Sequence, residues 1–383
     1  MTPLKAVTAT DPYPYYARLA SEKPLYFDES LKLWVASNAC FVEEVFRNPD
    51  FEVRPRAEPI PNALLGLRGG AVFGSLMRMT DGAKRCPLKS TAVDAINEGS
   101  AKECGRLAAE FASILKDRSG EASSLDLVRR LMFQLPTYTI GSCLGTCPNE
   151  LDAMTVEVST FVAGISPIAS SEQRILGDSA AEALSNRLVT LINSTFKTGV
   201  LLKNFVAAGA VRSIESDIIV RNLVGFLFQT YDATAGLIGN SVRLLAQDAA
   251  LQRGLLTDDA SLRSFVWEVL RFDPPVQNTR RFATKDVRLG DSNIRAGEQV
   301  LLVLAAANRD PSRFPMPERF DVDRSGHRAF GFGFGTHECP GKPLALEITC
   351  AALRILLTSS FSFRAIPEAV TYRASANTRM PLF

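Results

Sequence analysis

The chain has very little histidine, with His327 and His337 as the two examples in 383 residues. Because zinc and non-haem iron sites usually take several imidazole ligands, this scarcity argues against a histidine-rich metal centre. The seven cysteines are an odd number, and their scattered spacing matches neither a disulfide framework nor a zinc motif. This cysteine usage predicts a protein of the reducing cytoplasm.

The chain also lacks a strong net charge and a long apolar run. Its formal net charge of +2 is too small to indicate nucleic-acid binding. The first residues, Met1–Thr8, contain no spanning apolar stretch and no signal-peptide pattern, so we expect no membrane attachment. A hydrophobic content of 46% is ample for a large core, and no linker or internal repeat interrupts it.

The most informative feature that is present is a glycine-rich run around Cys339, which reads Phe-Gly-Phe-Gly-Thr-His-Glu-Cys-Pro-Gly from Phe332 to Gly341. A thiolate ligand must be held rigidly, and glycines allow a loop to fold tightly around it. The residues after Gly341 are typical of a helix start, whose positive dipole end would favour a thiolate. The run therefore predicts a metal-binding cysteine, the alternative being an ordinary cysteine in a turn.

Two motifs resemble signatures of the cytochrome P450 family. The haem-binding signature is matched at Phe332, Gly335, His337, Cys339 and Gly341, and a Glu-x-x-Arg motif lies upstream at Glu268 and Arg271. Further family-like segments lie between them, namely Ala307–Pro311, Phe314 and Pro317–Asp321. The resemblance extends over nearly the whole chain.

The resemblance implies a mainly α-helical fold with a small β-rich lobe, formed by a single domain over residues 1–383. Haem b would lie between a long distal helix and the proximal cysteine loop, with the Cys339 thiolate as the axial iron ligand. The expected activity is oxidation of a small, functionalised metabolite with dioxygen, in a biosynthetic pathway. Electrons would come ultimately from NAD(P)H through a ferredoxin or flavodoxin and its reductase to a monomeric enzyme.

Further haem contacts follow from the resemblance. Arg85 and Lys89 are four residues apart and would share a helix face toward the haem propionates, where the family usually has His and Arg. A solvated face is the alternative for this pair. Arg281 and His337 are the other expected propionate partners. Because Arg280 is adjacent, the sequence leaves open which of the two arginines takes this position. Phe332, Gly333 and Gly341 would contact the macrocycle.

Glu268 and Arg271 are interpreted as structural residues rather than catalytic ones. We expect them to form a buried ion pair that Arg319 or Arg324 completes, because an unpaired buried charge would be unfavourable.

The distal helix is expected from about Ser216 to Gln247. The family places an acid followed by an alcohol here, to deliver protons for cleavage of dioxygen. This chain keeps the acid as Asp232 but has Ala233 at the alcohol position, with Thr234 one residue later. One residue rotates a helical side chain by about 100°. Either the helix is bulged, or Gln229, ordered water or the substrate supplies the contact.

The substrate pocket is expected to use residues from five segments. A Pro- and Gly-rich loop over residues 55–74 would cover it, and its polar lining favours a functionalised substrate, which could be tethered to a carrier protein. The candidates are Gly225, Phe226, Gln229 and Ala233 on the distal helix, then Val276, Gln277, Asn278, Asn377 and Thr378, with Phe73, Leu76, Phe161 and Ile165 as apolar walls.

Two alternatives to oxygen insertion stay open. Ala233 is compatible with non-standard chemistry of the same family, such as oxidative coupling, nitration, or reactions driven by peroxide or nitric oxide. From a different class, a haem-binding gas sensor is also conceivable, although no output domain accompanies it.

Overall fold

The computed structural model describes residues 1–119, 124–194, 199–256, 258–324, 326 and 329–383, and of residues 83–85 it describes the backbone alone. Contacts group the chain into two units. The first comprises Met1–Arg56, Gly236–Cys339 and Leu356–Phe383, and the second comprises Ala57–Ala235 and Pro340–Ile355. The expectation of one domain over residues 1–383 stays a prediction.

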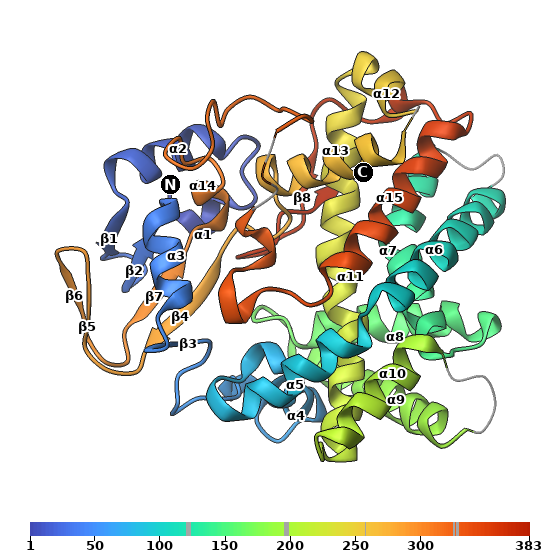
Figure 1. The fold of residues 1–383 in the computed structure, drawn as a ribbon, viewed down its shortest axis with the longest axis horizontal. Coiled ribbons are helices and arrows are strands. Elements are labelled where there is room, and N and C mark those ends of the chain that lie inside the picture. The colour runs from blue at the N-terminus through green and yellow to red at the C-terminus, as the bar shows by residue number, and fades with distance from the viewer. Residues whose placement is uncertain (120–123, 195–198, 257, 325, 327–328) are drawn as a thin grey trace. The chain divides into compact units, whose positions relative to one another are not determined.

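The first unit contains a five-stranded sheet in the order β1-β2-β7-β4-β3 (Figure 1). Strands β2 and β7 pair in parallel, and the other neighbouring strands pair antiparallel. Two small hairpins, β5-β6 and β8-β9, accompany the sheet. The strands are β1 Leu25–Asp28, β2 Leu33–Ala36, β3 Phe51–Glu52, β4 Thr279–Ala283, β5 Val287–Leu289, β6 Ser292–Ile294, β7 Gln299–Leu302, β8 Thr371–Tyr372 and β9 Pro381–Leu382.

Some of the helices in this unit begin at a residue whose side chain caps them. The side chain of Asn38 accepts a hydrogen bond from the Phe41 N–H at the start of α3, and Asp258 does the same for Ser261 at α13. Phe330 is buried in the same core as Val42 and Phe314. The helices of this unit are α1 Pro3–Ala6, α2 Tyr13–Glu22, α3 Ala39–Arg47, α12 Ala249–Leu255, α13 Asp259–Phe272 and α14 Leu304–Ala307.

The second unit is helical. Its helices are α4 Arg68–Ser75, α5 Gly82–Ala95, α6 Glu98–Ser119, α7 Ser124–Leu144, α8 Leu151–Gly164, α9 Ser171–Asn193 and α10 Val200–Val211. Two further helices, α11 Ser216–Ala246 and α15 Lys342–Thr358, have residues in both units. A mainly α-helical fold with a small β-rich part is confirmed. In the part of the chain that the structure describes, no helix combines the length and apolarity needed to cross a bilayer.

The expectation of an irregular loop over residues 55–74 is wrong, because α4 and a short 3-10 helix, Asn62–Leu64, lie in that range. Gly69, Gly70 and Gly74 are poor helix formers by local propensity. Tertiary contacts override that propensity, since Asp178 of α9 accepts hydrogen bonds from the Arg68 and Gly69 N–H groups at the start of α4.

A buried charge cluster in the first unit ties distant segments together. Asp273 is fully buried and accepts hydrogen bonds from Arg379 at 3.0 Å, from Arg243 at 2.8 Å and from the Tyr13 hydroxyl. Arg379 also donates to the carbonyl groups of residues 7, 9 and 10. The cluster thereby joins the N-terminal segment, the end of α13 and the C-terminal segment.

Because of this cluster, we predict that the folded protein loses stability in acid. Burial alone would raise the pKa of Asp273, but Arg379 and Arg243 more than offset it, and the pKa lies below its ordinary value of 3.8. The contribution to the free energy of unfolding is therefore complete above the unfolded-state pKa and is lost as the pH falls below about 4. In urea unfolding, Asp273→Asn should be strongly destabilised at about pH 6 and much closer to wild type at about pH 3. Asp291→Asn, on the surface, is the control, and an equal deficit of Asp273→Asn at both pH values would contradict the prediction.

Candidate haem-thiolate site

The loop around Cys339 is closed by its own main chain. The Gly333 N–H donates to the Phe330 carbonyl and the Cys339 N–H donates to the Phe332 carbonyl, both at 2.8 Å. Two 3-10 turns, Phe330–Phe332 and Gly335–His337, form the body of the loop. Cys339 itself is exposed. The sequence run therefore folds into a rigid turn with an accessible thiol at its end.

Gly333 is required in this turn for two reasons. Its φ of 75° lies in the left-handed region, and an added Cβ would lie 2.7 Å from the His337 carbonyl oxygen. A side chain would therefore push apart the two halves of the loop.

We predict that Gly333→Ala lowers the haem content of the purified protein. The conformational strain alone is roughly 1–2 kcal/mol, and the contact with His337 adds to it. Gly297→Ala is the matched control, because Gly297 has a similar φ of 85° but no atom within 4 Å of the added Cβ. The measurement is the haem-to-protein ratio by absorbance, and equal ratios for the two variants would count against a specific role of Gly333.

The start of the loop is braced from neighbouring elements of the first unit. The Phe330 N–H donates to the Asn308 side chain at 2.7 Å, and the Phe332 ring packs edge-on to Trp267 with ring centroids 5.9 Å apart. The Arg47 guanidinium lies 4.9 Å from the Phe334 ring centroid. Sequence reasoning did not single out Asn308 and Trp267 as supports, although Asn308 lies in a segment that carried the family resemblance.

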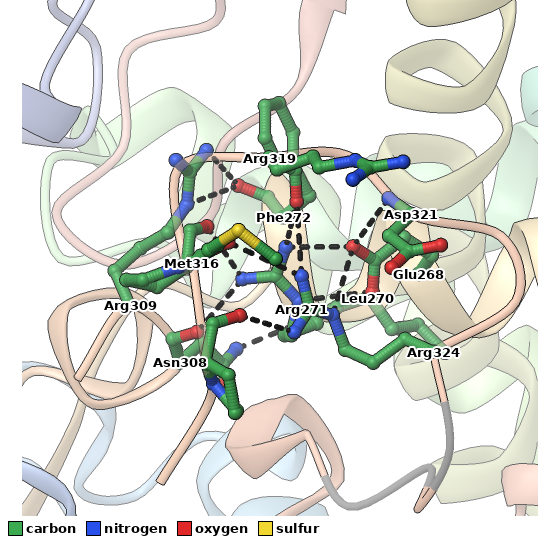
Figure 2. A network of polar contacts seen from close by, with 12 residues as sticks. Glu268, Leu270, Arg271, Phe272, Asn308, Arg309, Met316, Arg319, Asp321 and Arg324 are labelled. Carbon is green, nitrogen blue, oxygen red and sulfur yellow. Dashed lines mark hydrogen bonds and ion pairs between the residues drawn. The ribbon is translucent and has the colours of Figure 1, made fainter. Parts of the chain in front are cut away.

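The Glu-x-x-Arg motif forms a buried network (Figure 2). Arg271 donates to Glu268 at 2.6 and 2.9 Å, and Arg324 donates to the same carboxylate at 3.3 Å. Arg319 contributes its carbonyl oxygen, which accepts from Arg271 at 2.9 Å. Arg271 also donates to the Asn308 carbonyl at 3.1 Å, so the network is linked to the residue that holds Phe330.

The expected haem contacts have different surroundings. On β4, Arg281 is buried whereas Arg280 is exposed, so Arg281 occupies the inward register. Its guanidinium lies 4.9 Å from the Phe46 ring centroid and donates to the Arg280 carbonyl at 2.7 Å. Lys89 is half-buried on α5, and the side chain of Arg85 lies outside the described residues. His337 closes the second 3-10 turn, and Gly341 directly precedes α15.

Helix α11 runs without a bulge through the expected oxygen-activation motif. Thr234 is buried, with 1% of its surface exposed, whereas Asp232 and Ala233 are half-buried. The Gln229 amide donates to the Gly225 carbonyl at 2.9 Å, and the Thr230 hydroxyl donates to the Phe226 carbonyl at 2.7 Å. A regular helix leaves Thr234 rotated away from the position of Ala233.

Of the pocket candidates in the second unit, several belong to the helical packing. Leu76 and Phe161 have no exposed surface, and Phe226 has 8%. Phe226 packs edge-on to Phe205, and Phe161 to Phe228. A Cβ on Gly225 would lie 2.6 Å from Leu76, so the helix and Leu76 touch at this glycine. Phe73 and Ile165 are half-buried.

In the first unit the structure brings two candidate segments together. The Gln277 N–H donates to the Asn377 carbonyl at 2.8 Å, and Val276 forms a bridge with Thr378. The Asn278 amide donates to the Ala376 carbonyl at 2.8 Å. Asn377 is exposed, whereas Gln277 is fully buried and donates to the Pro274 carbonyl.

The residues at the cysteine loop fit haem-thiolate ligation. The donor is a thiol at an exposed position, and the neighbouring Gly333 and Gly335 carry no side chain that would obstruct a flat macrocycle. Thiolate sulfur is a ligand that suits haem iron. Cys339 would hold the iron, and Arg281 stays the expected partner of a propionate.

The chain is similar to known cytochromes P450. A family model described as Cytochrome P450 matches residues 243–372. The mycinamicin IV hydroxylase/epoxidase of Micromonospora griseorubida is 33% identical, over 78% of this chain and 75% of that protein. Cytochrome P450 monooxygenase PikC of Streptomyces venezuelae is 30% identical, over 91% of this chain and 84% of that protein.

Solved structures show the same fold. CalO2 superposes with a TM-score of 0.86 at 22% identity, covering 100% of this chain and 96% of that one. P450BioI, solved in complex with a hexadec-9Z-enoic acid ligated acyl carrier protein, superposes with a TM-score of 0.82 at 23% identity, covering 99% and 97%. Together with the cysteine loop and its buried brace, these likenesses show that the chain belongs to the cytochrome P450 family of haem-thiolate monooxygenases.

Proposed function

We propose that this enzyme uses dioxygen, and electrons that originate from NAD(P)H, to hydroxylate or otherwise oxidise a small, functionalised metabolite of a biosynthetic pathway. The observation that carries the proposal is the closed Cys339 loop, held through Asn308 and the Glu268–Arg271 pair. A ferredoxin or flavodoxin with its reductase is the proposed electron source for a monomeric, cytoplasmic enzyme. When bound, haem supplies the oxidising chemistry, and the protein supplies orientation and proton traffic.

The chain's own residues divide this work. Cys339 would hold the iron through its thiolate. Asp232 is the acid of the distal helix and would pass a proton toward the reacting oxygen. The pocket residues would orient the substrate, and the bridge between Val276 and Thr378 supports placing these two segments in one wall of that pocket.

The substrate class is part of the same proposal. The names of two relatives, mycinamicin IV hydroxylase/epoxidase and the monooxygenase PikC, do not specify a substrate for this chain. The acyl carrier protein in the P450BioI complex supports carrier-tethered metabolites as candidates to be tested. Polar candidates such as Gln229 and Asn377 favour a substrate with functional groups.

The direct test is an optical titration of the ferric holoenzyme with free and carrier-tethered metabolites, followed by turnover with ferredoxin, reductase, NADPH and labelled dioxygen. Incorporation of one labelled oxygen atom into product supports oxygen insertion. Product without label would instead favour the second candidate, non-standard oxidation. The regular helix at Ala233 and the buried Thr234 favour that candidate, because neither places a hydroxyl at the usual position.

A pair of variants tests proton delivery by α11. If Gln229 belongs to the relay, Gln229→Leu should lower product formed per electron consumed by about tenfold or more. Thr234→Ala on the same helix should change this ratio little, because the Thr234 side chain is buried. The ratio is measured from NADPH oxidation and product. If both variants match wild type, the protein relay is wrong and water or substrate delivers the proton.

A further inference from the structure

Tyr13, at the start of α2, is hydrogen-bonded to a buried carboxylate. Its hydroxyl donates to Asp273, which has no exposed surface. The same carboxylate accepts from Arg379 at 3.0 Å and from Arg243 at 2.8 Å, and these two cations favour its charged form. All four residues belong to the first unit. The Tyr13 phenol therefore has an ionised proton acceptor in direct contact inside the protein.

The ring of Tyr13 packs against a cation and two other rings. The Arg309 guanidinium, which donates to the Phe272 carbonyl at 2.8 Å (Figure 2), lies 4.1 Å from the Tyr13 ring centroid. The Phe272 ring is stacked on Tyr13 at 6.2 Å, and the Tyr16 ring lies edge-on at 6.0 Å. A cation beside the ring disfavours added positive charge on it. Loss of an electron alone would create that charge, whereas loss of an electron together with the phenolic proton would not. These surroundings favour the coupled loss, with Asp273 as the acceptor of the proton.

Tyr16, on the same helix, has the opposite environment at its hydroxyl. Its side chain has no exposed surface, and its hydroxyl oxygen has no hydrogen-bond partner among the residues that the structure describes. Burial raises the pKa of this phenol. A phenol without an acceptor cannot release its proton when it is oxidised, so the charged product would be buried without compensation. Tyr16 is therefore a poor redox site, although its ring lies beside that of Tyr13.

A second tyrosine, Tyr138 of α7, also donates to a carboxylate, that of Asp152. The Asp152 side chain is 66% exposed, so a proton passed to it can leave to water. A proton passed to the buried Asp273 stays beside the phenol oxygen and can return when the electron returns. Of these two phenols, Tyr13 is the one suited to reversible oxidation.

We propose that Tyr13 is a reversible one-electron redox site, which protects the enzyme from oxidising equivalents that substrate has not consumed. One electron passes from the phenol to a one-electron oxidant and the phenolic proton passes to Asp273, which leaves a neutral phenoxyl radical and a carboxylic acid. A one-electron reductant such as ascorbate reverses both transfers. The group that is spared is the exposed Cys339 thiol, whose higher oxidation states are irreversible. The protective part needs the oxidising chemistry of bound haem and so rests on the proposed function, whereas the redox site itself does not.

The redox site is tested by light-driven oxidation of the ferric holoenzyme with tris(bipyridine)ruthenium and a sacrificial electron acceptor. Electron paramagnetic resonance of samples frozen after the flash should show a tyrosyl radical that ascorbate removes. Tyr13→Phe keeps the ring and should lose most of this signal. Tyr16→Phe, the matched control, makes the same change in the neighbouring ring and should keep it. An undiminished signal in Tyr13→Phe, or a signal lost in Tyr138→Phe instead, would overturn the assignment.

Protection is tested by the rate at which haem absorbance is lost when hydrogen peroxide is added to the ferric holoenzyme without substrate. Tyr13→Phe should lose haem absorbance several-fold faster than wild type, because the oxidising equivalent then attacks the haem and its ligand loop. Tyr16→Phe should match wild type. Equal rates for Tyr13→Phe and wild type would overturn the protective role. A holoenzyme without turnover would contradict the proposed function but leave the light-driven result intact.

Discussion

Cys339→Ser is expected to remove the thiolate signature from the absorbance spectrum of the ferrous carbon monoxide complex and to abolish turnover. A serine hydroxyl is a far poorer iron ligand than a thiolate and does not push electron density toward the oxygen. Loss of a residue that only supports a ligand costs 10–100-fold in metal affinity or activity, so loss of the ligand itself should cost at least about a hundredfold. Haem content and product formation per unit time measure the effect.

The matched control is Cys40→Ser, since Cys40 is also an exposed cysteine and lies on α3 of the same unit. It should keep the wild-type spectrum and activity. A Cys339→Ser protein with the thiolate spectrum would show that another residue holds the iron, and the assignment of the site would then be wrong.

The local structures around Cys339 and Glu268 could be predicted from the sequence because they depend on local spacing. A ligand loop needs glycines at positions where the chain turns back on itself, and the φ values of Gly333 and Gly335 are those of left-handed turns. The Glu268–Arg271 pair is three residues apart on one helix, so the contact follows from helix geometry alone.

Features that depend on distant partners could not be predicted in this way. The segment that forms α4 was expected to be a loop. Its helical start could not be foreseen because the capping residue, Asp178, lies 110 residues away in the sequence. The sequence did not decide whether Arg319 or Arg324 completes the Glu268–Arg271 pair. It is Arg324 that donates to the carboxylate, whereas Arg319 turns its carbonyl to Arg271. Local patterns do not determine which of two nearby cations reaches a buried acid.

The substrate pocket shows the same limit. On α11 the Gln229 amide was expected to contact oxygen or substrate, yet it donates to the Gly225 carbonyl one turn earlier. Gln277 was expected to line the pocket, yet it is fully buried and donates to the Pro274 carbonyl. Side-chain direction at such positions is set by tertiary packing, which the order of residues does not reveal.

Glu268→Ala is expected to lower the free energy of unfolding by about 3–5 kcal/mol, because it leaves buried arginine charge without its carboxylate. The side chains of Glu268 and Arg271 are 4% and 3% exposed, so water cannot compensate. Glu268 also accepts from the Asp321 N–H at 2.9 Å, and this bond is lost as well. Urea unfolding followed by circular dichroism measures the change.

The matched control for this prediction is Glu29→Ala. Glu29 pairs with Lys32 at the same spacing of three residues, but both side chains are more than 70% exposed, so its loss should change stability by less than about 1 kcal/mol. Replacing both partners, as Glu268→Leu with Arg271→Met, should be less damaging than Glu268→Ala, because no charge is then left unpaired. If Glu268→Ala were as stable as Glu29→Ala, the pair would not brace the fold. Since Arg271 reaches Asn308, and Asn308 holds Phe330, the destabilised variant should also retain less haem.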